Sequence, residues 1–137
     1  MKIMLEEWAY TPVRGHKDDA GLDLRSPIDF AVKPGDSATI DTGVHVEINP
    51  GFVGMLKSKS GLNVKHGITS EGVIDAGYTG SIVAKLYNHG KKTVFFDKGD
   101  KITQLVIMPV YIPHELFFVN ELDKTERGNG GFGSTGK

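Results

Sequence analysis

Residues 43–51 read GVHVEINPG, and this stretch carries the clearest secondary-structure signal in the chain. Apolar and polar side chains alternate strictly over residues 44–48, which puts the apolar ones on one face of an extended strand. Gly43 precedes the alternation and Asn49-Pro50-Gly51 follows it, and these residue types are typical of turns. The stretch therefore predicts a short strand with one buried face, formed by Val44, Val46 and Ile48.

The same pattern of short apolar runs and turn residues continues along the chain. Most of the 18 glycines separate such runs, and helical periodicity is almost absent. We expect one helical turn over residues 60–65 and further strands over residues 28–32, 38–41, 52–58, 81–87, 93–96 and 102–112. Many short strands at turn spacing predict an all-β fold, a jelly-roll-like β-sandwich or barrel.

Length and charge limit the classes of function. A chain of 137 residues has the size of one ordinary domain. Its 16 Lys and Arg residues nearly balance 17 Asp and Glu residues, so no global field would gather nucleic acid or an anionic membrane. Any phosphate site must be local. The chain has no cysteine, which excludes a disulfide framework, a thiolate zinc site and a cysteine nucleophile.

The N-terminal residues favour a cytoplasmic protein. Glu6 and Glu7 interrupt the apolar run that a signal peptide needs, and no window approaches the ~18 consecutive apolar residues of a membrane span. The lack of cysteine suits a reducing compartment. We therefore expect a cytoplasmic protein that binds neither membranes nor nucleic acid directly.

Residues 72–80 read GVIDAGYTG, two extended runs around a turn at Ala76-Gly77, and this pattern predicts a β-hairpin. Asp75 at the edge of the turn and Tyr78 three residues later would face a common cleft. Asp75 does not stand at a helix start, which disfavours a capping role. The structural alternative is an aspartate that hydrogen-bonds its own turn, as Asx motifs do.

Three further segments each allow a ligand-binding and a structural interpretation. In KSKSGL, residues 57–62, lysines alternate with serines before a glycine, which suits phosphate oxygens but is also typical of an exposed strand face. In GDKITQL, residues 99–105, Gln104 is either a core amide or a ligand contact. In AGLDLRS, residues 20–26, a structural ion pair between Asp23 and Arg25 would explain both charges equally well.

The last segment, RGNGGFGSTGK at residues 127–137, has five glycines and one aromatic residue and cannot build a core by itself. Arg127, Phe132, Ser134 and Thr135 are residue types that bind nucleotides, through a cation, a stacking face and hydroxyl groups. A disordered tail and a mobile lid both fit this composition, and the lid is the sharper hypothesis. We divide the chain into a β core at 1–126 and a flexible C-terminal arm at 127–137.

Taken together and in this order, the segments resemble the five signature motifs of the trimeric dUTPase family. The motifs are AGLDLRS at 20–26, KSKSGL at 57–62, GVIDAGYTG at 72–80, GDKITQLV at 99–106 and RGNGGFGSTG at 127–136. The resemblance spans nearly the whole chain and implies a jelly-roll homotrimer with active sites at subunit interfaces. It also implies hydrolysis of dUTP to dUMP and pyrophosphate, which limits uracil in DNA and supplies dUMP for dTMP synthesis.

By this resemblance the hairpin residues take defined roles. The family's aspartate matching Asp75 activates the water that attacks the α-phosphorus. The tyrosine matching Tyr78 stacks on the deoxyribose and leaves no room for a 2′-hydroxyl. Main-chain groups around Val73, Ile74 and Val83 read the uracil ring, so specificity rests on the backbone more than on side chains.

The resemblance assigns the phosphates to a second group of residues. Lys59, Ser60 and Gly61 match the family's phosphate-binding Arg-Ser-Gly, and lysine in place of arginine keeps the charge but gives up bidentate geometry. Gln104 would lie near the phosphates. Thr69 stands where many relatives carry asparagine near the substrate.

The glycine-rich arm is implied to close the site. Arg127 would reach the γ-phosphate and Phe132 would cover the uracil ring. Gly133 and Ser134 are further substrate-binding candidates by position in the same motif. The arm would therefore act as the lid that its composition allows.

Magnesium is the implied cofactor, held mostly by the three phosphates and water, with Asp23 at most an outer-shell contact. The implied partners are dUTP and two further copies of the chain, together with a regulatory protein if the chain is phage-encoded. Three alternatives compete with this reading. They are the related dCTP deaminase, which needs a base placed at the cytosine ring, a protein-binding module, and a structural jelly roll without nucleotide affinity.

Overall fold

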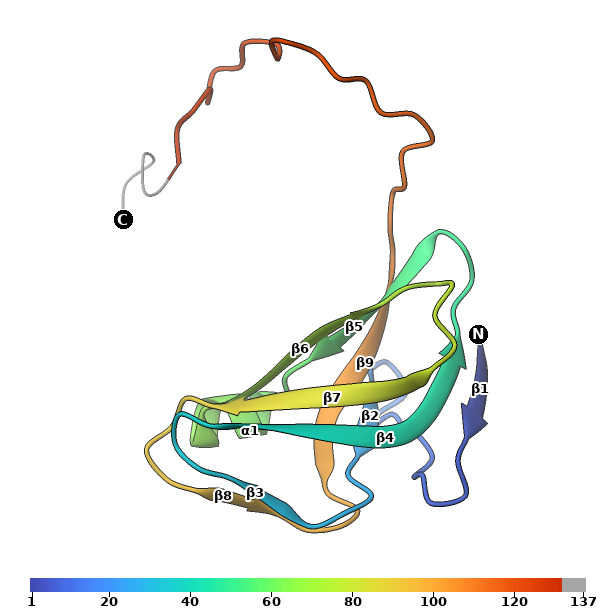
Figure 1. The fold of residues 1–137 in the computed structure, drawn as a ribbon, viewed down its shortest axis with the longest axis vertical. Helices are drawn as coiled ribbons and strands as arrows, with labels where there is room; N and C mark the ends of the chain where they lie inside the picture. The colour runs from blue at the N-terminus through green and yellow to red at the C-terminus, as the bar shows by residue number, and fades with distance from the viewer. Residues whose placement is uncertain (132–137) are drawn as a thin grey trace.

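The computed structural model describes residues 1–131, and these form an almost all-β structure with one short helix (Figure 1). In chain order the elements are β1 (Lys2–Leu5), β2 (Gly21–Arg25), β3 (Phe30–Val32), β4 (Ser37–Glu47), β5 (Phe52–Lys57), α1 (Ser60–His66), β6 (Ile68–Ile74), β7 (Ser81–Asn88), β8 (Val94–Phe96) and β9 (Lys101–Pro109). The expected all-β class and the helical turn near residue 60 are confirmed.

Seven strands form one curled sheet, in the order β1-β4-β7-β6-β5-β9-β2, while β3 and β8 form a separate two-stranded ribbon. Each of these strand pairs is antiparallel. β4 crosses the molecule from the end near α1 to the end near β1 (Figure 1). This curled antiparallel sheet is the jelly-roll architecture that the strand spacing predicts.

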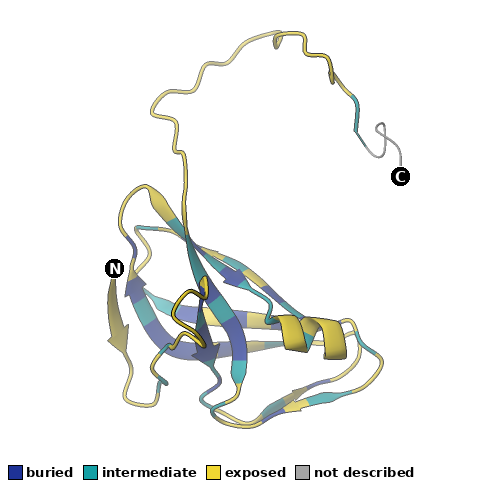
Figure 2. Cartoon of the chain, turned by 180° about the vertical axis from the view of Figure 1, so that it is seen from behind, coloured by how far each residue is buried: buried dark blue, intermediate teal, exposed yellow. Residues whose placement is uncertain are grey.

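Two clusters of buried apolar side chains form the core. Figure 2 shows the buried residues on the long strands of the sheet. The first contains the alternating residues Val44, Val46 and Ile48, whose exposures are 1%, 2% and 3%. In the second, the rings of Phe30 and Phe96 stack with their centroids 4.6 Å apart. Each fully buried aliphatic side chain stabilises the fold by about 1.5–3 kcal/mol. The buried face predicted from the sequence is therefore confirmed.

The structure joins two expected strands, at 38–41 and 44–48, into the single strand β4. The join passes through Gly43, whose φ of 67° is in the left-handed region that favours glycine. A Cβ atom there would lie 2.7 Å from the Trp8 ring. Pairing with β7 shifts register between Asp41 and His45, so this part of β4 is a β-bulge. The glycine that predicted a turn is a bulge residue inside a longer strand.

Other strand bounds also differ from the expectation. β3 begins at Phe30 instead of residue 28, and β9 ends at Pro109 instead of residue 112. The sequence did not predict β1, because its side chains are all exposed and show no burial alternation. β1 exists because it pairs with the last part of β4, from Lys2 opposite Glu47 to Leu5 opposite Val44.

After Pro109 the chain leaves the sheet, and residues 110–131 extend away from the fold without a strand or helix (Figure 1). This extended segment begins well before Arg127, the expected start of the arm. It exposes many apolar side chains, and Phe117 and Phe118 are 81% and 95% exposed. An exposed apolar run of this kind is typical of a segment that packs against another molecule.

No helix within residues 1–131 is long and apolar enough to cross a membrane.

Candidate active site

The predicted hairpin is open at its tip. β6 pairs with β7 only from Ile68 to Ser70, and its second half pairs on its other side with β5, up to Ile74 opposite Gly54. β7 meanwhile pairs with β4, with Val83 opposite Asp41. The facing edges of the two strands therefore separate toward the turn and leave backbone groups available to a ligand.

A pocket of about 240 Å³ occupies the opening between the strands. Its lining consists of Val73, Ile74, Asp75, Tyr78, Ser81 and Val83. Val73 and Val83 are 60% and 45% exposed, so they offer apolar walls to an occupant. Two apolar walls and two strand edges suit a small planar ring whose own edges carry hydrogen-bond donors and acceptors. The expected common cleft of Asp75 and Tyr78 is confirmed.

The turn itself has the predicted centre at Ala76-Gly77. The N–H of Tyr78 donates to the carbonyl of Asp75 at 3.0 Å, and the Tyr78 hydroxyl donates to the carbonyl of Ser81 at 3.0 Å. The Tyr78 ring lies over Gly80, where an added Cβ would meet the ring Cζ at 2.6 Å. Within residues 1–131 no hydrogen bond uses the Asp75 carboxylate, so the Asx-motif alternative is wrong for this part of the chain and the exposed carboxylate is free to act on a ligand.

A second cluster surrounds Asp23 on β2. Its side chain is 7% exposed, with Oδ1 paired to Lys59 and Oδ2 to Lys101 at 2.7 Å. Burial raises the pKa of Asp23, but hydrogen bonds from Lys101 and Lys59 and their positive charges outweigh it and lower the pKa below its ordinary value. The carboxylate is therefore ionised at neutral pH and holds two cations in place.

The suggested ion pair between Asp23 and Arg25 is wrong. Arg25 instead donates from Nη1 to the carbonyl of Gly99 at 2.6 Å. The pairing of β2 with β9 shifts register between Leu24 and Arg25, and this irregularity breaks the alternation that would have put both charges on one face.

Gln104 and the residues of the KSKSGL segment lie beside the Asp23 cluster. The Gln104 side chain donates from Nε2 to the carbonyl of Ser58 at 3.1 Å, which ties β9 to the segment before α1. Lys59 precedes the helix, and Ser60 and Gly61 are its first two residues, both exposed. The first helical hydrogen bond runs from the Asn63 N–H to the Lys59 carbonyl, so the N–H groups of Ser60 and Gly61 are not used inside the helix.

The Asp75 pocket and the Asp23 cluster lie at opposite ends of β6. The N–H of Ser70 donates to Ser58 Oγ at 2.9 Å, which places the start of α1 beside this point of the strand. Asp75 comes five residues later, roughly 16 Å along a strand that rises ~3.3 Å per residue. In Figure 1, α1 lies near one end of β6 and the β6–β7 turn lies at the other. Within one copy of the chain, Asp75 and Lys59 are therefore well separated along β6.

The remaining candidates are separate from both clusters. Thr69 lies in the paired half of β6, where its hydroxyl contacts His89 Nε2 at 3.0 Å and not the pocket. Arg127 is exposed in the extended segment and donates from Nε to the Gly130 carbonyl at 2.9 Å. Phe132, Gly133 and Ser134 lie outside the described residues.

Metal coordination by the protein alone is not supported in the described part of the chain, residues 1–131. These residues contain no group of three or more His, Asp or Glu side chains arranged to hold a metal ion. Asp23 already accepts contacts from two lysines with its two oxygens. Asp23 therefore offers no free oxygen to the inner coordination sphere of a metal ion, and a metal ion here would depend on ligands that a substrate brings.

The sequence did not single out Ser81 or Lys101. Ser81 lines the pocket, and its carbonyl oxygen accepts a hydrogen bond from the Tyr78 hydroxyl. The Lys101 ammonium pairs with the Asp23 carboxylate and balances its charge. Lys101 lies in the GDKITQL segment, but its pairing with Asp23 depends on the antiparallel register of β2 and β9. No local pattern reveals such a register.

Comparison with known proteins agrees across sequence and structure. The family model for dUTPase matches residues 7–136. The deoxyuridine 5'-triphosphate nucleotidohydrolase of Gloeothece citriformis is 44% identical over 135 residues, which cover 96% of this chain and 92% of the relative.

Two solved phage structures are also similar. The dUTPase of Staphylococcus bacteriophage 80alpha with dUPNHPP has a TM-score of 0.91 at 33% identity, over 99% of this chain and 98% of that one, and is described among phage dUTPases that control transfer of virulence genes. A mutant dUTPase from phage phi11 of S. aureus has a TM-score of 0.80 at 33% identity, over 88% and 96% of the two chains. That structure is described as revealing the coordination of a structural Mg(II) ion.

Proposed function

The chain belongs to the dUTPase family and is a dUTP diphosphatase, and we propose that the open end of the β6–β7 hairpin holds its deoxyuridine and supplies the catalytic base. The observation that carries this proposal is the pocket between the diverging strands. Asp75, Tyr78 and the separated strand edges meet in that one cavity. Its volume of about 240 Å³ is smaller than the ~300–1,000 Å³ of a typical ligand site, so it would take the nucleoside and leave the phosphates outside.

Uracil recognition would use the backbone around Val73, Ile74 and Val83. A strand edge offers alternating N–H donors and C=O acceptors, the same kinds of group that a pairing base presents to uracil. The exposed side chains of Val73 and Val83 would pack on the uracil ring. They would also limit the space for the methyl group that distinguishes thymine from uracil. The Tyr78 ring would stack on the deoxyribose, where its fixed position excludes a 2′-hydroxyl.

Catalysis would begin at Asp75. Its carboxylate accepts a proton from a water molecule as that water attacks the α-phosphorus. The bond from the α-phosphorus to the bridging oxygen then breaks, and pyrophosphate leaves with that oxygen. The exposed, unpaired state of the carboxylate in the described residues supports this role, because a base must have a free lone pair.

The phosphate chain would lie against Lys59, Ser60, Gly61 and Gln104. Lys59 supplies charge, and the free N–H groups of Ser60 and Gly61 supply hydrogen bonds to phosphate oxygens. Mg²⁺, when bound to the phosphates, would neutralise their charge and orient them. Asp23 would contribute to phosphate binding by holding Lys59 and Lys101 in place. It would also be an outer-shell neighbour of the magnesium ion.

The separation of the Asp75 pocket from the Asp23 cluster supports shared sites in a homotrimer. Asp75 and Lys59 lie at opposite ends of β6 in one copy, so a site that uses both needs two copies. The exposed apolar segment at residues 110–131 would cross a neighbouring copy and carry Arg127, Phe132, Gly133 and Ser134 to its nucleotide. Thr69 would approach substrate only in such an assembly. A protein partner of the kind suggested by the phage relative is a further expectation if the chain is phage-encoded.

Pyrophosphate release with Mg²⁺ and each of dUTP, dCTP, dTTP and UTP tests the proposal. We expect rapid release with dUTP and little with the other three. Equal turnover of dUTP and UTP would contradict the sugar-stacking role of Tyr78. Ammonia release from dCTP would indicate deaminase activity instead.

A further inference from the structure

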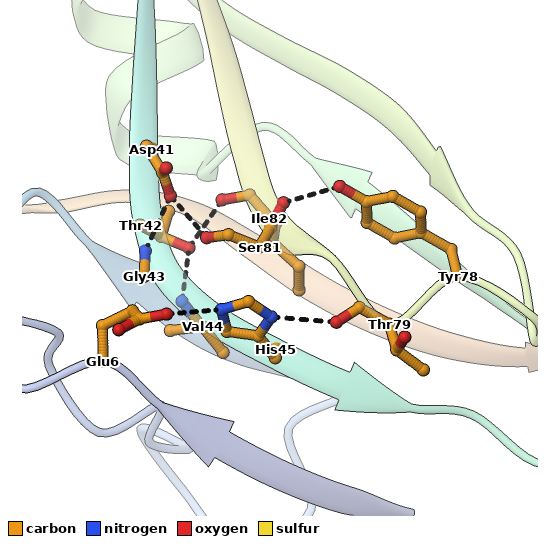
Figure 3. Close-up of polar contacts among 10 residues, drawn as sticks. All are labelled: Glu6, Asp41, Thr42, Gly43, Val44, His45, Tyr78, Thr79, Ser81 and Ile82. Atoms are coloured by element: carbon orange, nitrogen blue, oxygen red, sulfur yellow. Dashed lines mark hydrogen bonds and ion pairs between the residues drawn. The ribbon is translucent and has the colours of Figure 1, made fainter.

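We infer that His45, on the bulge of β4, is a positioning residue that holds the Tyr78 loop closed and so sets discrimination between deoxyribose and ribose. The inference rests on the proposed contact of Tyr78 with the sugar. His45 is outside the five motifs and does not line the nucleoside pocket. Its side chain is 17% exposed and lies between Thr79, directly after Tyr78, and Glu6 near the N-terminus (Figure 3).

The ring of His45 contacts both neighbours. Nδ1 lies 2.8 Å from the carbonyl oxygen of Thr79, and Nε2 lies 3.1 Å from Glu6 Oε1. A carbonyl oxygen has no proton to give, so Nδ1 is the donor in the first contact. Glu6 Oε1 is an acceptor too, so the second contact is a hydrogen bond only in the imidazolium form, in which Nε2 donates as well. In that form the two acceptors on opposite sides fix the orientation of the ring. The N–H of Glu6 also donates to the Gly43 carbonyl at 2.9 Å, which ties Glu6 to the same bulge.

The bulge is what places His45 opposite the loop. Asp41 pairs with Val83, and the next pair is His45 with Ser81. Four residue steps along β4 therefore correspond to only two along β7. In a regular ladder Gly43 would face Ser81, and a glycine has no side chain to reach the loop. The insertion in β4 therefore brings a side chain into contact with the strand end that carries Tyr78.

Two other bulge residues hold the same strand end. The Ser81 hydroxyl donates to Asp41 Oδ1, which also accepts the N–H of Gly43 at 3.0 Å. Thr42 donates from Oγ1 to the Ile82 carbonyl at 2.7 Å. Figure 3 shows Asp41, Thr42 and His45 in a row along β4, facing the strand that begins at Ser81.

These contacts lead directly to the position of the Tyr78 ring. Its hydroxyl donates to the Ser81 carbonyl, and its ring lies over Gly80, between the His45-bound Thr79 and the Asp41-bound Ser81. Loss of the His45 contact would free Thr79 and let the ring move away from the sugar. Space for a 2′-hydroxyl would then open, while Asp75 on the other side of the turn would keep its place.

Steady-state pyrophosphate release with dUTP and UTP tests the inference in His45→Ala. We expect the ratio of kcat/KM for dUTP to that for UTP to fall about 3- to 10-fold, the range for loss of one hydrogen bond. The change should come from KM, which should rise for dUTP and fall for UTP, with kcat for dUTP near that of the natural chain. His45→Asn keeps a donor near the Nδ1 position and should restore most of the ratio.

Two further variants separate positioning from general stability. Glu6→Ala should lower the ratio by a smaller factor, because the ring keeps its donor but loses its orienting partner. His16→Ala removes an exposed histidine that also neighbours a carboxylate, that of Asp19, and should leave the ratio unchanged. A purely structural histidine would lower the melting temperature and both activities together, with a constant ratio.

The outcomes distinguish this inference from the proposed function. A natural chain that does not prefer dUTP over UTP overturns the proposed role of Tyr78 and the inference with it. A natural chain that prefers dUTP, with an unchanged ratio in His45→Ala, overturns the inference alone. If His45→Ala does not fold, an unchanged ratio in Glu6→Ala decides against it.

Discussion

Replacing Asp23 with asparagine should lower the free energy of unfolding by about 3 kcal/mol at neutral pH. A hydrogen bond to a charged group contributes about 1.5–3 kcal/mol, and Asp23 accepts one from each of two lysines while its own side chain is 7% exposed. The Lys101 contribution is discounted because that side chain is 35% exposed and screened by water. For a domain of this size the loss corresponds to roughly 10 °C in Tm.

The stability lost in Asp23→Asn should become smaller as the pH falls. The folded pKa of Asp23 lies below its ordinary value of 3.8, so its stabilisation is complete above that value. Stability is lost as pH falls through the lower folded pKa, because a protonated carboxyl is neutral, as asparagine is. The difference in Tm between the natural chain and Asp23→Asn should therefore shrink toward zero in strong acid.

Thermal unfolding followed by circular dichroism from about pH 7 to about pH 2 measures both effects. Glu47→Gln is the matched control, because its partner Lys2 lies at 3.0 Å but is 81% exposed. That variant should change Tm little at any pH. Equal Tm values for the natural chain and Asp23→Asn at neutral pH would refute the reasoning. A Tm difference that is as large in acid as at neutral pH would also refute it.

Three further predictions address the site and the assembly. Asp75→Asn should bind a non-hydrolysable dUTP analogue nearly as well as the natural chain but turn over dUTP at least ~100-fold more slowly, since an amide does not accept the proton; more than about a tenth of the activity left, measured by pyrophosphate release, would exclude Asp75 as the base. Deletion of residues 127–137 should remove most turnover and change Tm little, because the proposed role of the arm is to cover bound nucleotide; near-normal turnover would identify it as a tail without function. Light scattering at micromolar concentration should give three times the 14.9 kDa chain mass, and a monomer mass would argue against shared sites.

Local sequence was sufficient for several elements of the structure. The alternation in residues 44–48 predicted which side chains are buried, because a strand shows alternate residues to opposite faces whatever it pairs with. The turn at Ala76-Gly77 and the helix that begins at Ser60 were also predicted, since both depend on neighbouring residues. The order of the five motifs indicated the family, and the comparisons confirmed it.

Tertiary structure decided how these elements meet. The opening of the hairpin depends on β6 changing partner from β7 to β5, and no residue in 72–80 signals that change. The charge of Asp23 is met by Lys59 and Lys101, and not by Arg25, because a register shift interrupts β2. A bulge in β4 likewise brings His45 to the Tyr78 loop. Strand periodicity is a local property of the backbone, whereas partner, register and bulge depend on residues distant in sequence, so only the folded chain determines them.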